Sequence, residues 1–219
     1  MPARAGAGWS TTLVVVMGIV WPSDGRVMRT STSVALLAAA LLAAPAVVHA
    51  AAHETPAPER TRIEIPGCGA LSLRLPFGWH HSIEAPTASL PTIASFRAPA
   101  GETLMISVFS NVRAEPGFNT ATSTRASVEE SGRSLLSTAV ESTLSIRELQ
   151  GTSHQGYFFS LTDKALVGKP PQPDDFKFLT SGEIGVGKLH LLFTILSNDR
   201  DSTATKAALE VVRTAAYEP

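Results

Sequence analysis

The chain has 219 residues, with 18 basic and 19 acidic side chains, six histidines and one cysteine. This nearly balanced charge, without a basic stripe, argues against a nucleic-acid-binding protein. The single cysteine excludes an internal disulfide, so a hydrophobic core has to hold the domain together.

An apolar run from Val34 to Val48 follows Met28 and Arg29 and is followed by Ala50. A basic start, an apolar stretch and small residues at the end are typical of a secretory signal peptide. The run is shorter than the roughly 20 residues that a membrane-spanning helix needs. We therefore predict cleavage between Ala50 and Ala51 and export by the general secretory route. The mature protein would be periplasmic or secreted, without a stable membrane span; an uncleaved membrane anchor is the alternative.

The signal peptide sets the expected organisation of the chain. We expect translation to start at Met28, which makes residues 1–27 an N-terminal extension outside the translated protein, and residues 28–50 to form the signal peptide. Residues 51–61 hold two prolines and predict a flexible leader. Residues 62–217 are predicted to form a single α+β domain. The only cysteine lies too far beyond Ala50 to carry a lipid anchor.

The first part of this domain has the pattern of β-strands. Leu71, Leu73 and Leu75 alternate with polar residues and predict a half-buried strand that Pro76 ends. Residues 92–97 and 104–109 are β-rich and are joined by turn-forming residues, which predicts a hairpin.

The period changes between residues 120 and 140. Val128, Gly132, Leu135 and Ala139 are spaced by three or four residues and predict one buried face of a helix. Ser127 and Glu130 fit a capping box, so we expect the regular helix to start at Ser127.

Strands are expected again after this helix. Residues 143–149 and 157–161 predict a second hairpin, and Gly185 and Gly187 predict a turn before the next strand. Residues 189–196 are apolar at both odd and even positions, which is typical of a central strand buried on both faces. Such a sheet needs helices or other packing on each side.

The last predicted element is an amphipathic helix over residues 199–217, with Asp201 or Ser202 as its N-cap.

The order of these elements resembles the PsbP-like fold family. A first strand ends in Pro76-Phe-Gly-Trp79, and a hairpin, an amphipathic helix, a meander with a very apolar last strand and a capped helix follow. The family includes the extrinsic PsbP proteins of photosystem II, the Ran-binding Mog proteins and small bacterial exported proteins of the DcrB-like group. The resemblance covers roughly residues 62–217. It implies an α/β/α sandwich around a central, mostly antiparallel sheet, and a domain that binds proteins and does not catalyse a reaction.

Several patterns that suggest chemistry have simpler explanations. Residues 182–188 (GEIGVGK) loosely match a phosphate-binding loop, but Leu189 stands where Mg²⁺ binding requires Ser or Thr, and a strand follows where a helix is needed. A hairpin turn explains these residues better. Asp163, Asp174 and Asp175 lack the spacing of a calcium-binding loop and predict solvated loop ends.

The histidines and the cysteine give an alternative function. His80, His81 and Glu84 lie close in sequence, but adjacent side chains in a strand point in opposite directions, so at most one histidine can share a site with Glu84. His154 and His190 are isolated in the sequence. A small hydrolase or metal-dependent enzyme that uses His81 and Glu84, with Cys68 or a distant histidine, is the alternative hypothesis. We predict no cofactor, metal or catalytic site.

The favoured hypothesis is a non-catalytic module that binds another envelope or exported protein. The long segment 162–175 is the predicted partner surface, because loops of this length are usually functional or disordered. The predicted contact residues are Val167, Lys169, Pro170, Pro171, Pro173, Asp174 and Asp175. A binder of a small apolar ligand between sheet and helices is a third possibility.

Overall fold

The computed structural model describes residues 58–87, 90–110, 117–170, 172 and 175–219. The predicted extension, signal peptide and cleavage site, including Ala50 and Ala51, lie outside these residues. Among the described residues, no helix combines the length and the apolar character needed to cross a bilayer.

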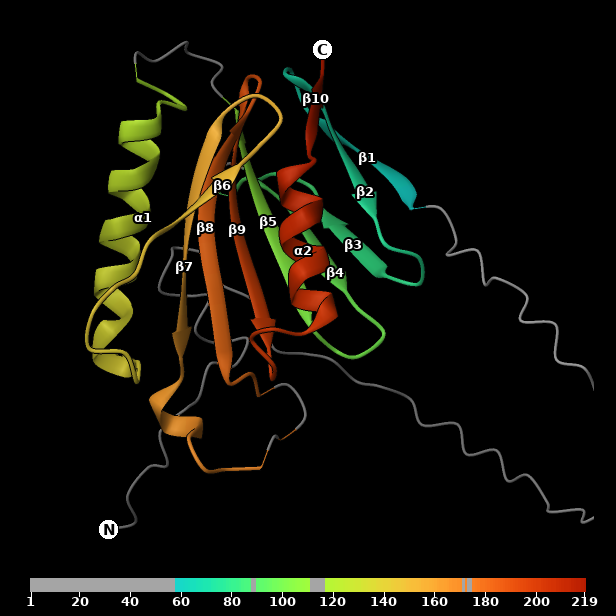
Figure 1. The fold of residues 1–219 in the computed structure, drawn as a ribbon. Coiled ribbons are helices and arrows are strands. Elements are labelled where there is room, and N and C mark those ends of the chain that lie inside the picture. Colours follow the sequence, from blue (N-terminus) through green and yellow to red (C-terminus); the bar gives the residue numbers. More distant parts are fainter. Residues whose placement is uncertain (1–57, 88–89, 111–116, 171, 173–174) are drawn as a thin grey trace, which may run out of the picture. The chain divides into compact units, whose positions relative to one another are not determined.

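A seven-stranded sheet forms the centre of the described fold (Figure 1). Its strands run in the order β3-β4-β5-β9-β8-β7-β6, and each neighbouring pair is antiparallel. The strands are β3 (His80–Glu84), β4 (Thr92–Arg97), β5 (Thr103–Ser110), β6 (Arg147–Gln150), β7 (Gln155–Thr162), β8 (Phe178–Val186) and β9 (Leu189–Ser197).

One α-helix covers each face of this sheet. Helix α1 (Ala121–Leu135), continued by the short 3-10 helix η2 (Leu136–Thr138), packs on β7 and β8. Helix α2 (Thr203–Arg213) packs on β9 from the other side, as Figure 1 shows. The predicted α+β class, with helices on both faces of a central antiparallel sheet, is therefore confirmed.

A second sheet of three strands lies beyond α2. It consists of β1 (Glu59–Ile65), β2 (Gly69–Leu75) and β10 (Ala216–Glu218), with β2 in the middle. Helix α2 contacts both β2 and β9, so it packs between the two sheets. Residues 59–61, predicted as part of a flexible leader, belong to β1. Residues 216–218, predicted to be mostly helical, form β10.

The core is divided between the two faces of the large sheet. On the α2 side, Phe158, Ile184 and Phe193 pack with residues of α2 and β2. On the α1 side, Val128 and Phe159 pack together with other apolar residues of β7, β8 and β9. Strand β9 contributes to both clusters, as its continuous apolar pattern predicted.

Local predictions were confirmed in part. The hairpin of β4 and β5 forms, and Val128, Gly132 and Leu135 lie on the buried face of α1. The predicted helix start at Ser127 is wrong: the helix begins at Ala121, because the Thr120 side chain accepts a hydrogen bond from the Ser123 amide. The second hairpin forms between β6 and β7, but β6 is shorter than predicted.

Candidate functional site

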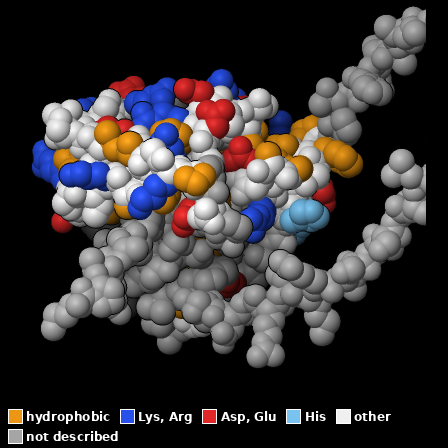
Figure 2. Space-filling view, turned by 90° about the horizontal axis from the view of Figure 1, so that it is seen from below, with side chains coloured by type: hydrophobic (Ala, Val, Ile, Leu, Met, Phe, Trp, Pro, Cys, Tyr) orange, Lys and Arg blue, Asp and Glu red, His pale blue; other side chains and the backbone are white. Residues whose placement is uncertain are grey.

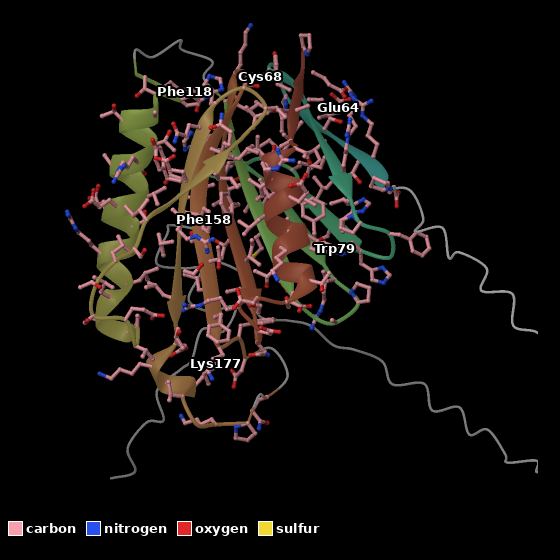
Figure 3. The ribbon with its side chains drawn as sticks, viewed as in Figure 1. Glu64, Cys68, Trp79, Phe118, Phe158 and Lys177 are labelled. Atoms are coloured by element: carbon pink, nitrogen blue, oxygen red, sulfur yellow. The ribbon has the colours of Figure 1, made fainter. Side chains whose placement is uncertain are left out.

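The large sheet has two ends that differ in structure. At the hairpin end, β8 turns into β9 between Val186 and Leu189. At the loop end, where Phe178 pairs with Ser197, a segment of residues 163–177 joins β7 to β8. Figure 3 places Phe118 at the hairpin end and Lys177 at the loop end.

Both ends of the joining segment are fixed by hydrogen bonds. The Asp163 carboxylate accepts from the Ala165 amide at 2.7 Å and caps the 3-10 helix η3 (Lys164–Leu166). The Asp163 amide donates to the Lys177 carbonyl at 2.8 Å. Asn198 accepts from the Lys177 amide and donates to the Asp175 carbonyl, each at 2.9 Å. The loop therefore leaves and rejoins the sheet in a defined position.

Glu141 and Arg200 strengthen this attachment. Glu141 accepts from the amide and the hydroxyl of Thr162 at 2.8 and 2.9 Å, and from Arg200 at 2.5 Å. Arg200 also donates to the Thr162 hydroxyl at 2.9 Å. Burial raises the pKa of Glu141, but the hydrogen bonds from Thr162 and Arg200 outweigh it, so the pKa lies below its ordinary value. The charged carboxylate is thus the form that fits this site.

Cations also gather around an aromatic ring here. The Lys177 ammonium lies 5.4 Å and the Arg200 guanidinium 5.2 Å from the centre of the Phe178 ring. Both distances are within the range of cation–π attraction. The first residue of β8 thus helps to hold the two cationic side chains at the loop end.

The middle of the loop is exposed. Val167 is 54% exposed, and Lys169 and Pro170 are exposed as well. Val140, which is 53% exposed, is tied to the start of the loop because its amide donates to the Thr162 carbonyl at 2.9 Å. In Figure 2, which views the molecule from below, basic side chains lie with hydrophobic ones between them.

The predicted loop residues have different positions. Asp163 is buried, so the prediction that it is a solvated loop end is wrong: its carboxylate caps η3 and its amide donates to the Lys177 carbonyl. Asp175 is half-buried, and its carbonyl accepts from Asn198. Pro171, Pro173 and Asp174 lie outside the described residues.

A second polar network lies at the hairpin end and was missed by the sequence analysis. The two ring nitrogens of His190 lie 2.8 Å from Asn119 Oδ1 and 3.0 Å from Glu183 Oε2. Ser127 Oγ donates to Glu183 Oε1 at 2.7 Å. Asn119 Nδ2 donates to the Leu189 carbonyl at 2.8 Å and the Gly187 carbonyl at 3.3 Å. The sequence suggested that His190 is isolated, but in the structure it contacts Asn119 and Glu183.

The order of contacts in this network points to a structural role. In the Ser-His-Asp arrangement the serine hydroxyl contacts the imidazole that takes its proton, and the carboxylate contacts the other imidazole nitrogen. Ser127 instead donates to Glu183, and it is Glu183 that contacts His190. The network joins the start of α1 to both strands of the β8–β9 hairpin. Gly185 makes room for it, because a Cβ there would lie 2.8 Å from Cγ of Asn119.

The phosphate-loop resemblance of residues 182–188 is explained by this hairpin. Residues 182–186 belong to β8, and the chain turns at Gly187 before β9 begins. Gly187 has a φ of 58°, and a Cβ there would approach the Tyr217 ring within 2.8 Å. These glycines thus serve the turn and its close packing.

The predicted enzyme site does not come together. Residues 80–84 form the exposed edge strand β3, where alternation places His81 and Glu84 on opposite faces of the sheet. The His81 ring lies 6.3 Å from that of Phe96. His154 lies in the turn before β7, and Cys68 is half-buried in the turn between β1 and β2 (Figure 3). The hypothesis built on His81 and Glu84 therefore lacks its geometric basis.

Two further kinds of site are a metal centre and a pocket for a small apolar ligand. Within the described residues, no three His, Cys, Asp or Glu side chains are grouped to hold a metal ion. A shallow surface depression is lined by Val128, Phe159, Leu192 and neighbouring residues. It encloses no space for a ligand, whereas sites for small apolar ligands are usually clefts or cavities of roughly 300–1,000 Å³.

Comparisons with known proteins give one distant likeness of interest. No family model and no curated protein matches the chain. The solution structure of cyanobacterial PsbP from Synechocystis sp. PCC 6803 is similar, with a TM-score of 0.46 and 10% identity over 75% of this chain and 96% of that chain. A likeness at this TM-score and identity assigns neither a family nor a function. The DcrB-like relationship stays a prediction.

Proposed function

We propose that this chain is an exported, non-catalytic module of the cell envelope that binds another protein through the loop end of its large sheet. The observation that carries the proposal is the anchored loop. The Asp163 and Glu141 carboxylates accept hydrogen bonds at its first end, and Asn198 donates to Asp175 at its second end. Val167, Lys169 and Pro170 are exposed between these ends. A segment whose ends are already held in place loses less conformational entropy when a partner docks on it.

The chemistry of this surface also suits a protein partner. Val167 and Val140 supply exposed apolar area, and Lys169 together with Lys177 supplies positive charge around it. Apolar contacts give affinity, whereas charges at the rim favour correct orientation and faster association. The proposed partner is a protein of the envelope with an apolar patch flanked by acidic side chains.

The test replaces residues 167–173 with a Gly/Ser linker of the same length. The exchange leaves Asp163 and Asp175 in place, so the fold should survive and the unfolding midpoint should change little. Capture of the partner from envelope extracts should fall at least about tenfold. Phe109→Ser is the matched control, because Phe109 is also exposed but pairs with His190 at the hairpin end. Unchanged capture by the folded linker variant would remove the loop from the proposal.

Export rests on the sequence and has its own test. The N-terminal sequence of the protein recovered from outside the cytoplasm should begin at Ala51. A protein that keeps residues 34–48 would contradict cleavage and favour the uncleaved anchor.

A further inference from the structure

Strand β3 is one edge of the large sheet, and within the described ranges of the chain no strand pairs with its outer side. All five residues from His80 to Glu84 are exposed, and Ile83 is 43% exposed although its side chain is apolar. The strand pairs with β4 on one side in an unbroken antiparallel register. An edge strand presents unpaired backbone N–H and C=O groups on its other side, which a further strand can bind.

Strands β6 and β1, which are also edges, are less suited to pairing. Strand β6, at the opposite edge, has only four residues and carries Arg147 and Glu148. In the small sheet, β1 carries Arg60, Arg62 and Glu64, with both arginines paired to Glu218 and Arg62 also to Glu64. Short length and charged side chains are the usual protection of edge strands. Strand β3 lacks such protection over its central residues.

The sequence of β3 is complementary to itself in one antiparallel register. We propose that two copies of this chain pair through β3 around a two-fold axis at Ser82, forming a closed dimer with a continuous sheet. In this register each His80 lies opposite Glu84 of the second copy, and His81 lies opposite Ile83. The two Ser82 side chains face each other. In each His80–Glu84 pair an imidazole N–H can donate to the carboxylate, and such polar pairs and hydroxyl pairs across strands stabilise an interface.

The neighbouring strand adds to this complementarity. Arg97 of β4 lies directly opposite His80, on the side away from the second copy. Alternation puts His80, Ser82 and Glu84 on one face of the sheet, so Glu84 of the second copy, His80 and Arg97 form one row across three strands on that face. The same arrangement occurs twice in the dimer because the interface is symmetric.

Other registers are less favourable. A shift of two residues in one direction places His81 opposite His81 and shortens the paired segment. A shift in the other direction places Ile83 opposite Ile83, and both shifts lose the pairs between His80 and Glu84. Pro76 and Pro86 flank the strand and limit its extension. The two-fold contact uses the outer side of β3 in each copy, so no β3 edge is left to bind a third copy.

The test measures self-association of the full-length protein, as its own host processes it, by sedimentation velocity over a range of concentrations. Wild type should show a reversible monomer–dimer equilibrium. Glu84→Lys and His80→Glu should each weaken dimerisation at least about tenfold, because the first removes the carboxylate acceptor from both symmetric pairs and the second places two carboxylates opposite each other. The double variant His80→Glu, Glu84→Lys places a carboxylate opposite an ammonium group in both pairs and should dimerise at least as well as wild type.

A second readout does not depend on charge. In a Cys68→Ser background, Ser82→Cys should form an intermolecular disulfide on mild oxidation, because directly opposite residues of antiparallel strands lie within disulfide distance. Ser134→Cys, on the exposed surface of α1, is the matched control and should stay monomeric. A wild type that remains monomeric at all concentrations would overturn the proposal. A dimer that neither cross-links through residue 82 nor responds to the charge variants would overturn it as well.

Discussion

The two ends of the large sheet each carry a glutamate that accepts hydrogen bonds from several donors, but the surroundings differ. The Glu183 side chain is 7% exposed and binds Ser127 and His190, which come from α1 and β9. The Glu141 side chain is 26% exposed and binds Thr162 and Arg200 beside the loop. The buried network fixes a helix on a sheet, whereas the half-exposed one positions a surface segment. Two clusters built around the same residue type therefore have different roles, because they hold different parts of the molecule in place.

A substitution midway between the two ends gives a reference value for the stability losses expected at each end. Phe193 is fully buried on β9, opposite Ile106 and Gly182. Phe193→Ala should lower the free energy of unfolding by about 3–5 kcal/mol, because the cavity has no solvent side into which the structure can relax. Urea denaturation measures this loss. A loss below that of either glutamate variant would contradict the burial of β9 on both faces.

Substitutions at the hairpin end should cause the next largest loss of stability. Glu183→Ala leaves the Ser127 hydroxyl and a His190 nitrogen without their partner, which should cost about 1–3 kcal/mol. The same denaturation experiment on the double variant Glu183→Ala, His190→Ala should show less than the sum of the single losses, because the two side chains share a contact. Strict additivity would mean that the contact contributes nothing.

The stability that the loop end contributes should depend on pH. The folded-state pKa of Glu141 lies below the ordinary value of 4.5, so the stability it contributes is present above that value and is lost as pH falls through the folded-state pKa. Glu141→Gln should cost about 1 kcal/mol at neutral pH. The difference between wild type and the variant should shrink as the pH falls below about 4.5. Denaturation at several pH values measures it, and a pH-independent difference would contradict the assignment.

The smallest effect is expected outside both ends. His81 is exposed on β3, and His81→Ala should change the free energy of unfolding by less than about 1 kcal/mol. A loss as large as that of Glu183→Ala would mean that the contact with Phe96 matters more than its exposure indicates.

The sequence predicted those parts of the fold that have a strong period. The apolar run of β9 and the stripe of α1 gave the central strand and one covering helix correctly. Strand β3 was missed because five exposed residues show no alternation of burial, and β10 because only its pairing with β2 makes it a strand. Ala215 is buried next to α2 although the helix has ended, so its apolar character extended the predicted helix too far.

The buried network could not be predicted for a different reason. Asn119 and His190 are 71 residues apart, and their contact depends on how α1 lies on the sheet. The contact between Glu183 and His190 could have been predicted from the hairpin. A turn at Gly187 places His190 opposite Gly185, and Glu183 is then its diagonal neighbour on the same face. The loop was easier to find, since its length and prolines mark it without knowledge of the register.

The pairing of β10 with β2 has a consequence for the order of folding. Residues 70–72 of β2 find their second neighbour in residues 216–218, and Arg60 binds Glu218 across 158 positions of the chain. Contacts between such distant segments form slowly, because a long loop must close first. During synthesis the small sheet stays incomplete until residue 218 has emerged. A polypeptide that travels through a narrow secretory channel as an unfolded chain would gain time from this delay.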